Sequence, residues 1–446
     1  MKAAISNNVN YKKQFSVVFI KFAVCFLLMG FAYRLFLSSF VQFSTVEVSD
    51  TAFVSNKTSS DLTMDRSTSQ NGKCDLFKGD WVQDPTGPFY TNHTCYSIEA
   101  HQNCMRNGRP DTGYLYWRWK PKDCEIPKFN PKKFVHMMRG KSLAFVGDSI
   151  MRNHVQSLLC ILSQVYSIKF VGQSCFISWC CISQLIILGL ALEMAYLLIL
   201  ALTALKSNVT LSYTNIVTEY SWRNKVMRST MTSNTKAEDA QLHLDKLDDV
   251  WTRQFDNFDY VVIAGGKWYL KSAIYYENNK IVGCHNCPGK NITEVGFEYA
   301  YRKALNSTLK YITRSKHKAY TFFRTATPDH FENGEWNTGG YCNRTDPFKE
   351  GEIDIRDIDE VMRKIELEEF ERALRIGSEV GLRIRLFDTT FLSLLRPDGH
   401  PGVYRQFQPF AGDSRHSKIQ NDCLHWCLPG PIDSWNDLMM EILVSS

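Results

Sequence analysis

Two short motifs in this chain bring together the residue types that serine-based acyl transfer needs. A Gly-Asp-Ser sequence ending at Ser149 follows an apolar run (143–146), and an Asp-x-x-His sequence runs from Asp422 to His425. The first pattern predicts a strand, a tight turn and a helix, which would expose the Ser149 hydroxyl beside a helix N-terminus. In the second, His425 would be the general base and Asp422 the carboxylate that orients it. These three are the predicted catalytic residues.

Each motif also has a simpler structural explanation. Gly, Asp and Ser all favour turns and helix N-caps, so a single Gly-Asp-Ser sequence often marks only the start of a helix. A single Asp-x-x-His sequence often holds a structural histidine. Together, in this order and near the two ends of one domain, the motifs resemble the arrangement of GDSL/SGNH hydrolases. That resemblance favours the catalytic interpretation.

Further residues near these motifs are expected to support the site. The apolar segment 258–264 predicts a buried strand ending in Gly265 and Gly266, and sites in α/β sheets gather at the carboxyl ends of strands. We expect the backbone N–H of Ser149 and one from these glycines to meet an oxyanion, although a plain strand-to-loop turn also explains the pair. The residues expected to shape the turn or support the site are Gly147, Asp148, Arg152 and Asn153.

The order of the predicted elements indicates the fold class. Strand-like segments alternate with helix-like ones, which is typical of an α/β layered domain, here of the GDSL/SGNH-hydrolase type. Residues 74–124 are rich in cysteine and aromatic side chains and predict a disulfide-stapled N-terminal lobe, whose aromatic side chains either stack on sugars or form its core. The predicted strands are 258–264, 319–328 and 382–388, with helices at 296–314 and 356–377.

The N-terminus predicts a membrane anchor. An apolar stretch at 15–37, long enough to cross a bilayer, follows a lysine-containing segment at 1–14, which predicts a cytosolic tail. The alternative is a cleaved signal peptide, but no convincing cleavage site follows the stretch. Residues 38–72 are polar and predict a flexible stem. The folded domain, 73–446, would then lie in the lumen as part of a single-pass type II protein.

Composition and sequons fit a luminal glycoprotein. The net charge of +6 is mild and no basic block is present, so no nucleic-acid partner is expected. Asn-x-Ser/Thr sequons recur after the predicted anchor and are candidates for glycosylation. They lie at Asn56, Asn92, Asn208, Asn291, Asn306 and Asn343.

Longer blocks of sequence resemble the plant trichome birefringence-like family of PC-esterase-type proteins. They are CDLFKGDWV, FVGDSIMRNHVQSLLC, FRTATPDHFENGEWNTGGYCNRT, RPDGHPGVY and DCLHWCLPGPIDSWNDLM. The resemblance implies a Golgi O-acetyltransferase that moves acetyl groups onto cell-wall polysaccharide, with acetyl-CoA or another acetyl carrier as co-substrate and no bound cofactor. It is closest to the branch linked to xyloglucan and related hemicelluloses such as xylan or mannan.

Two other functions use the same features. A luminal polysaccharide acetylesterase would have the same triad and pass the acetyl group to water. A non-catalytic protein that binds wall glycans would depend on the aromatic lobe alone. The three predicted catalytic residues cannot separate transfer from hydrolysis, and only the resemblance favours transfer.

The cysteines predict disulfides. Of 14 cysteines, four lie in the apolar stretch or in an atypical segment described below, which leaves an even number for a luminal domain. From their location, the preferred pairs are Cys74–Cys124 and Cys95–Cys160, and Cys342, Cys423 and Cys427 are expected to pair near the Asp-x-x-His motif. The Cys284-x-x-Cys287 sequence resembles half of a zinc site, but no second ligand pair has the required spacing, so no metal is expected.

One segment departs from the family pattern. Residues 166–207 replace a polar stretch with an almost uncharged run that is long enough to span a membrane. A second span would place Ser149 and His425 on opposite sides of the bilayer. A buried core helix is another explanation, and we favour a third, in which the run is translated intron or another gene-model error.

We predict that deleting this run and restoring a polar stretch raises secretion and activity of the luminal domain. The reason is that an apolar run of this length must otherwise be buried in protein or lipid. The measurement compares secreted yield and acetyl transfer to glycans for the two versions. Good yield and activity of the chain as written would show that the run is a tolerated insertion.

Overall fold

The computed structural model describes residues 74–96, 98–165, 210–215, 240–379, 381–411 and 420–445. The expected tail, anchor and stem, the atypical segment 166–207, and the sequons at Asn56 and Asn208 lie outside these residues. None of the helices in the described ranges combines the length and the apolar character needed to cross a membrane.

A five-stranded parallel sheet forms the centre of the fold and confirms the predicted α/β class. Its order is β10-β9-β6-β3-β4. Strands of parallel sheets are buried on both faces, which explains why several of them read as apolar runs. The strands are β3 (Ser142–Gly147), β4 (Thr210–Asn215), β6 (Tyr260–Ile263), β9 (Tyr320–Arg324) and β10 (Ile384–Phe387).

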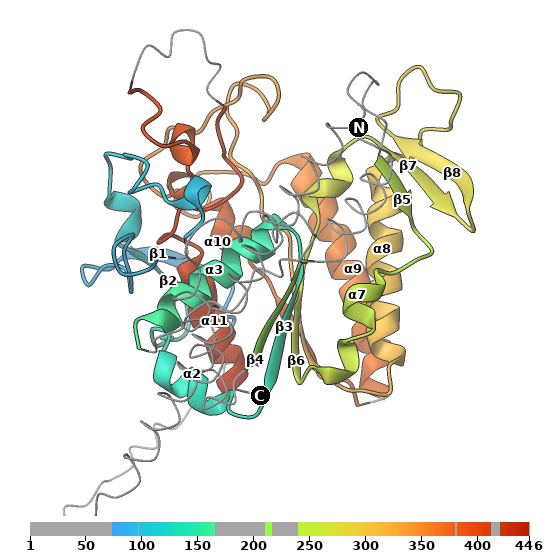
Figure 1. Cartoon of the computed structure of the whole chain (residues 1–446), viewed down its shortest axis with the longest axis horizontal. Helices are drawn as coiled ribbons and strands as arrows, with labels where there is room; N and C mark the ends of the chain where they lie inside the picture. Colours follow the sequence, from blue (N-terminus) through green and yellow to red (C-terminus); the bar gives the residue numbers. More distant parts are fainter. Residues whose placement is uncertain are drawn as a thin grey trace, which may run out of the picture. The chain divides into compact units, whose positions relative to one another are not determined.

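Helices cover both faces of this sheet, as Figure 1 shows. Successive side chains of a strand point to opposite faces, and β3 illustrates the result: Leu143 and Phe145 join one core, and Ala144 and Val146 join the other. On the first face lie α2 (Pro131–Met137), α3 (Ser149–Ser163) and α11 (Asp433–Val444), and on the second lie α7 (Asp249–Thr252), α8 (Gly296–Arg314) and α9 (Asp357–Glu379).

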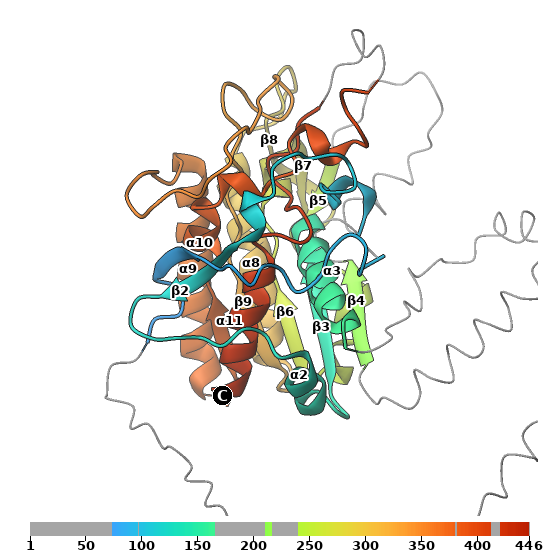
Figure 2. The same cartoon turned by 90° about the vertical axis from the view of Figure 1, so that its left-hand side faces the viewer.

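The N-terminal lobe packs outside α3 and α11 (Figure 2). It contains an antiparallel strand pair, β1 (Gly79–Gln83) and β2 (Trp117–Pro121). Trp81 and Trp119 are buried and meet edge to face, and the Trp81 indole N–H donates to the carbonyl of Leu392 in α10 (Thr390–Leu394). These aromatic side chains therefore form a core, which was one of the two explanations considered for them, and are not a surface that stacks on sugars.

A smaller sheet, which the sequence patterns did not predict, follows the order β5-β7-β8. Strand β5 (Ala240–His243) pairs in parallel with β7 (Ala273–Glu277), which pairs antiparallel with β8 (Lys280–His285).

All ten cysteines in the described residues form disulfides, and these include both preferred pairs, Cys74–Cys124 and Cys95–Cys160. Cys342 pairs with Cys423, which flanks the Asp-x-x-His motif. Cys427 pairs with Cys104, which lies in the N-terminal lobe near the other end of the chain. The reason is that the chain after the Asp-x-x-His motif returns to the lobe, where the Leu428 N–H donates to the Gln102 carbonyl.

The sequons differ in accessibility. Asn291 and Asn343 are exposed and Asn92 is half-buried. Asn306 lies within α8, and its amide nitrogen donates to the buried Glu369 carboxylate at 2.8 Å. Because glycans attach to this nitrogen, the structure disfavours Asn306 as a glycosylation site.

We predict that the double replacement C104A/C427A lowers the free energy of unfolding by roughly 2–5 kcal/mol, because this bridge joins distant parts of the chain. The matched control is C284A/C287A, which removes a bridge between residues only three apart and should cost less. Chemical denaturation without reductant measures both. Equal losses in the two variants would contradict the prediction.

Candidate active site

The Gly-Asp-Ser sequence forms a tight turn between β3 and α3. Asp148 caps the helix by accepting a hydrogen bond from the Ile150 N–H at 3.1 Å, and Ser149 is the first helical residue. At Gly147, a β-carbon would lie 2.6 Å from the Ala264 carbonyl oxygen and 2.8 Å from the Met151 side chain. Only glycine therefore fits at this point. The turn places the Ser149 hydroxyl at the carboxyl edge of the sheet, as predicted.

The structure brings the three predicted catalytic residues into one hydrogen-bonded line. The Ser149 Oγ lies 2.8 Å from the His425 Nε2, and the His425 Nδ1 lies 2.9 Å from an oxygen of Asp422. An ionised carboxylate can only accept hydrogen bonds, so the Nδ1 carries the proton and the Nε2 is free to accept the proton of Ser149. This is the geometry of a nucleophile, its base and the group that orients the base.

The local backbone holds Asp422 firmly in place. The same carboxylate accepts hydrogen bonds from the backbone N–H groups of Leu424 and His425, at 3.2 and 3.0 Å. Burial alone raises the pKa of Asp422, but the charge and hydrogen bonds of His425 outweigh it, so the pKa lies well below its usual range. Burial alone lowers the pKa of His425, but the Asp422 carboxylate outweighs this effect and raises the pKa above the ordinary value of a histidine. Asp422 thus stabilises the protonated, imidazolium form of His425.

Asn153 connects the nucleophile helix to the histidine loop. Its side chain is fully buried, its Oδ1 accepts from the Trp426 N–H at 2.7 Å, and its Nδ2 donates to the Trp426 carbonyl at 3.3 Å. Asn153 lies one turn beyond Ser149, and Trp426 follows His425. The two hydrogen bonds therefore help to set the distance between Ser149 and His425, and Asn153 supports the arrangement of the predicted site in this way.

Arg152 connects helix α3 to the N-terminal lobe. It forms an ion pair with Glu99 at 3.4 Å, and Glu99 also faces His101 at 3.3 Å. The His101 ring meets the His425 ring edge to face, with centroids 6.0 Å apart. Glu99 and His101 were missed in the sequence because the lobe carries no motif that points to this site.

Gly265 and Gly266 lie beside the nucleophile turn, since the Ala264 N–H bonds the Val146 carbonyl at the end of β3. The Gly265 carbonyl accepts from the Tyr301 hydroxyl at 2.8 Å. At Gly266, a β-carbon would lie 2.7 Å from the Met362 side chain, so this residue packs against α9. Their backbone N–H groups find no acceptor among the described residues. Their oxyanion role remains a prediction.

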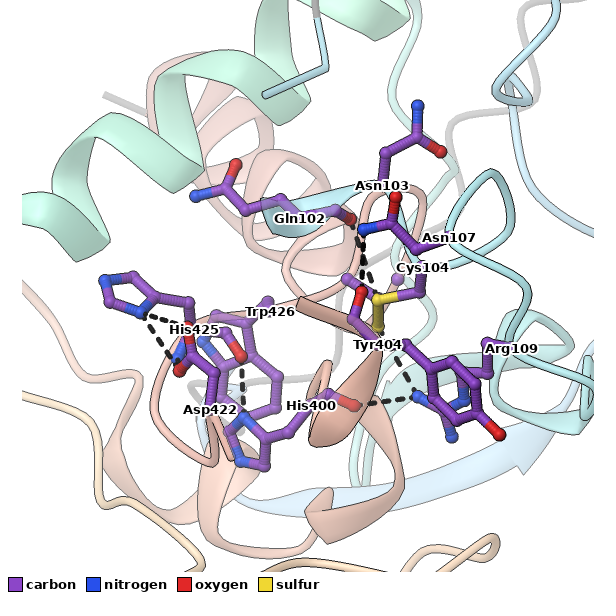
Figure 3. Close-up of a disulfide and its surroundings, with 12 residues drawn as sticks. Gln102, Asn103, Cys104, Asn107, Arg109, His400, Tyr404, Asp422, His425 and Trp426 are labelled. Atoms are coloured by element: carbon purple, nitrogen blue, oxygen red, sulfur yellow. Dashed lines mark hydrogen bonds and ion pairs between the residues drawn. A yellow bond between two sulfur atoms is a disulfide. The ribbon is translucent and has the colours of Figure 1, made fainter. Parts of the chain in front are cut away.

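The N-terminal lobe also fixes the loop behind His425, as Figure 3 shows. Arg109 donates to the carbonyl oxygens of Asp398 and His400, at 2.7 and 2.9 Å, and the Cys104–Cys427 disulfide lies next to it. His400 in turn contacts the His425 carbonyl oxygen. The sequence blocks that contain His330 and His400 were noted for their resemblance, but neither histidine was assigned a role.

One group of side chains in the described residues has the composition of a metal site. Cys284, Cys287 and Glu294 bring ligand-type atoms within 4.8 Å of one another. Because the two sulfur atoms are bonded to each other, they do not present the thiolates that zinc prefers.

Comparison with known proteins identifies two family regions. Residues 126–442 match PC-Esterase, the GDSL/SGNH-like acyl-esterase family found in Pmr5 and Cas1p, and residues 72–125 match the PMR5 N-terminal domain. The chain is 48% identical to protein trichome birefringence-like 26 of Arabidopsis thaliana, over 92% of this chain and 87% of the relative.

Two relatives with a named activity are also similar over most of their length. Xyloglucan O-acetyltransferase 1 of Populus trichocarpa is 39% identical, over 86% of this chain and 85% of the relative. Xyloglucan O-acetyltransferase 1 of Arabidopsis thaliana is 40% identical, over 83% and 80%. The matches over most of the chain lead to one conclusion: the chain belongs to the PC-esterase family, among the trichome birefringence-like proteins.

Proposed function

We propose that this protein is an O-acetyltransferase that moves acetyl groups onto xyloglucan or a related hemicellulose through an acetyl-Ser149 intermediate. The observation that carries the proposal is the continuous line from Ser149 through His425 to Asp422, at 2.8 and 2.9 Å. Relatives named xyloglucan O-acetyltransferases support the acceptor class.

In the first half-reaction, the Ser149 Oγ attacks the acetyl carbonyl of the donor while the His425 Nε2 takes the hydroxyl proton. Asp422 stabilises the imidazolium that forms. The negative oxygen of the tetrahedral intermediate is met by the Ser149 N–H at the start of α3, with Gly265 or Gly266 as the second donor. The intermediate collapses by breaking the bond to the donor's leaving group, which takes the proton from His425. The product is acetyl-Ser149.

In the second half-reaction, a sugar hydroxyl is the nucleophile. His425 takes its proton as the sugar oxygen attacks the acetyl-serine carbonyl. The bond to the Ser149 Oγ then breaks, and His425 returns the proton to this oxygen. If water attacks in place of the sugar, the same residues give an acetylesterase, so exclusion of water decides between transfer and hydrolysis.

The proposed location is the Golgi lumen, behind an anchor at residues 15–37. The five disulfides within the described residues support an oxidising, secretory compartment. The accessible sequons at Asn291 and Asn343 support a luminal domain.

We expect Ser149→Ala to lower kcat for acetyl transfer by more than about 10³-fold, because it removes the atom that carries the acetyl group. The fold should persist, since Asp148 and not Ser149 caps α3. The assay incubates full-length protein with an acetyl donor and hemicellulose oligosaccharides and measures the mass of the products.

The matched control is Ser163→Ala, which makes the same change in the last residue of the same helix. There the hydroxyl donates to the Cys160 carbonyl and accepts from the Gln164 side chain, away from Ser149. It should keep wild-type activity. Full activity of a folded Ser149→Ala variant would rule out the mechanism. A loss of acetyl mass from acetylated substrate, with no transfer, would favour the esterase.

The raised pKa of His425 predicts the pH dependence. General-base action needs the neutral ring, and the protonated form is stabilised by Asp422. The ratio kcat/KM should therefore fall as the pH drops through the raised pKa of His425, which lies above that of an ordinary histidine. Asp422→Asn removes the charge that raises this pKa. The acid limb should therefore move to lower pH while the maximum rate falls, and pH profiles of both proteins measure this. An unshifted acid limb in Asp422→Asn would contradict the assignment.

A further inference from the structure

Two buried histidines contact each other behind the proposed catalytic loop. His330 follows β9 and His400 lies in the 396–402 loop, and their exposed fractions are 7% and 4%. The His330 Nδ1 lies 2.7 Å from the His400 Nε2. The proposed mechanism does not use either ring.

Each ring also contacts a backbone carbonyl through its other nitrogen. The His330 Nε2 lies 2.8 Å from the carbonyl oxygen of Leu394, and the His400 Nδ1 lies 2.8 Å from the carbonyl oxygen of His425. The two rings thus form a chain of three short contacts with a carbonyl at each end. Figure 3 shows the link from His400 to the His425 backbone.

A count of protons shows what this chain requires. A carbonyl oxygen can only accept, so the two end contacts need a proton on the His330 Nε2 and on the His400 Nδ1. Two neutral imidazoles carry only these two protons, which leaves lone pairs facing each other across 2.7 Å. A third proton, held between the rings, converts that contact into an N–H···N hydrogen bond. Only the singly charged pair therefore satisfies all three contacts.

The surroundings of the pair contain groups that stabilise a positive charge and groups that oppose it. The Trp426 ring stacks on the His400 ring, with centroids 4.3 Å apart and planes at 24°, which favours an imidazolium. Burial lowers the pKa of both rings and opposes the charge. The charged or titratable groups that face the pair are the carboxylates of Asp329, Asp398 and Asp422 and the guanidinium groups of Arg109 and Arg356.

We propose that His330 and His400 are positioning residues for His425. The two rings share one extra proton and carry a single positive charge, and the His400 N–H holds the backbone carbonyl of the proposed base. Asn153 holds the backbone of the next residue, Trp426, through two further hydrogen bonds. This inference depends on the proposed function only for the role of His425, and the charge of the pair is a separate property of the fold.

The activity test uses three variants of the full-length protein. His400→Leu removes the donor to His425 and should lower kcat about tenfold with KM unchanged, since one hydrogen bond to the base is lost. His400→Asn places an amide N–H where the Nδ1–H was, and should return kcat to within about twofold of wild type. His330→Gln keeps a donor for the Leu394 carbonyl and leaves a neutral His400 to bond His425.

The pH profile separates positioning from a merely structural role. In the wild type, loss of the shared proton at high pH leaves one contact without a proton, so kcat should fall on the alkaline side. His400→Asn and His330→Gln each remove the contact between the two rings, so no shared proton is needed and both variants should lack this alkaline limb. An alkaline limb that persists in both amide variants would overturn the proposal, as would equal kcat values for His400→Leu and His400→Asn in folded protein.

A spectroscopic measurement tests the charge without any activity. Nitrogen NMR of protein labelled with ¹⁵N-histidine, assigned with the two amide variants, should show three protons on the four nitrogens of the pair at pH 7. Two neutral rings would refute the proposal. If the charged pair is found but the wild type transfers no acetyl group, the proposed function fails. The inference that the pair carries one positive charge would still hold.

Discussion

The hydrogen bond between Ser149 and His425 depends on a join between two segments that are 276 residues apart. One segment is the first turn of α3 and the other is the loop before α11. The Asn153 amide bonds both backbone groups of Trp426, so the helix and the loop are connected one turn away from the reacting atoms. A proton transfer needs heavy atoms within about 2.6–3.2 Å. The rest of the domain can be understood as the framework that keeps this distance.

The N-terminal lobe belongs to that framework, although it matches a separate family region. The lobe reaches the back of the histidine loop through the Cys104–Cys427 disulfide and through Arg109, which donates to two carbonyl oxygens of the 398–400 segment. The lobe also contacts Arg152 of α3 through Glu99 and the His425 ring through His101. Small loops lose order easily when few contacts hold them. These contacts attach the loop that carries His425 to the lobe at several points and favour one position of the His425 ring.

Several charged groups are buried around the same edge of the sheet, and their partners explain how the fold tolerates them. Arg396 and Asp398 form a fully buried ion pair at 2.7 Å, and Arg396 also donates to the Tyr114 carbonyl in the lobe. Glu366 is buried below Gly265, and burial raises its pKa to about 7 while Tyr301 and the Ala326 N–H bond it. Removing one member of such a network leaves the other buried and unpaired, which is strongly destabilising. These groups therefore hold one arrangement of the loops.

The sequence alone determined the parts of the protein that depend on local patterns. Apolar runs predicted four of the five parallel strands, all except β4, and the sequence also predicted the helices α8 and α9. The two motifs pointed to Ser149, Asp422 and His425. Contacts between distant segments were decided only by the tertiary structure. They include the Cys104–Cys427 bridge, the turn of Asn153 toward Trp426, and the meeting of His330 with His400. Residue spacing carries no information about such contacts, because they form only when loops from separate strands meet at one edge of the sheet.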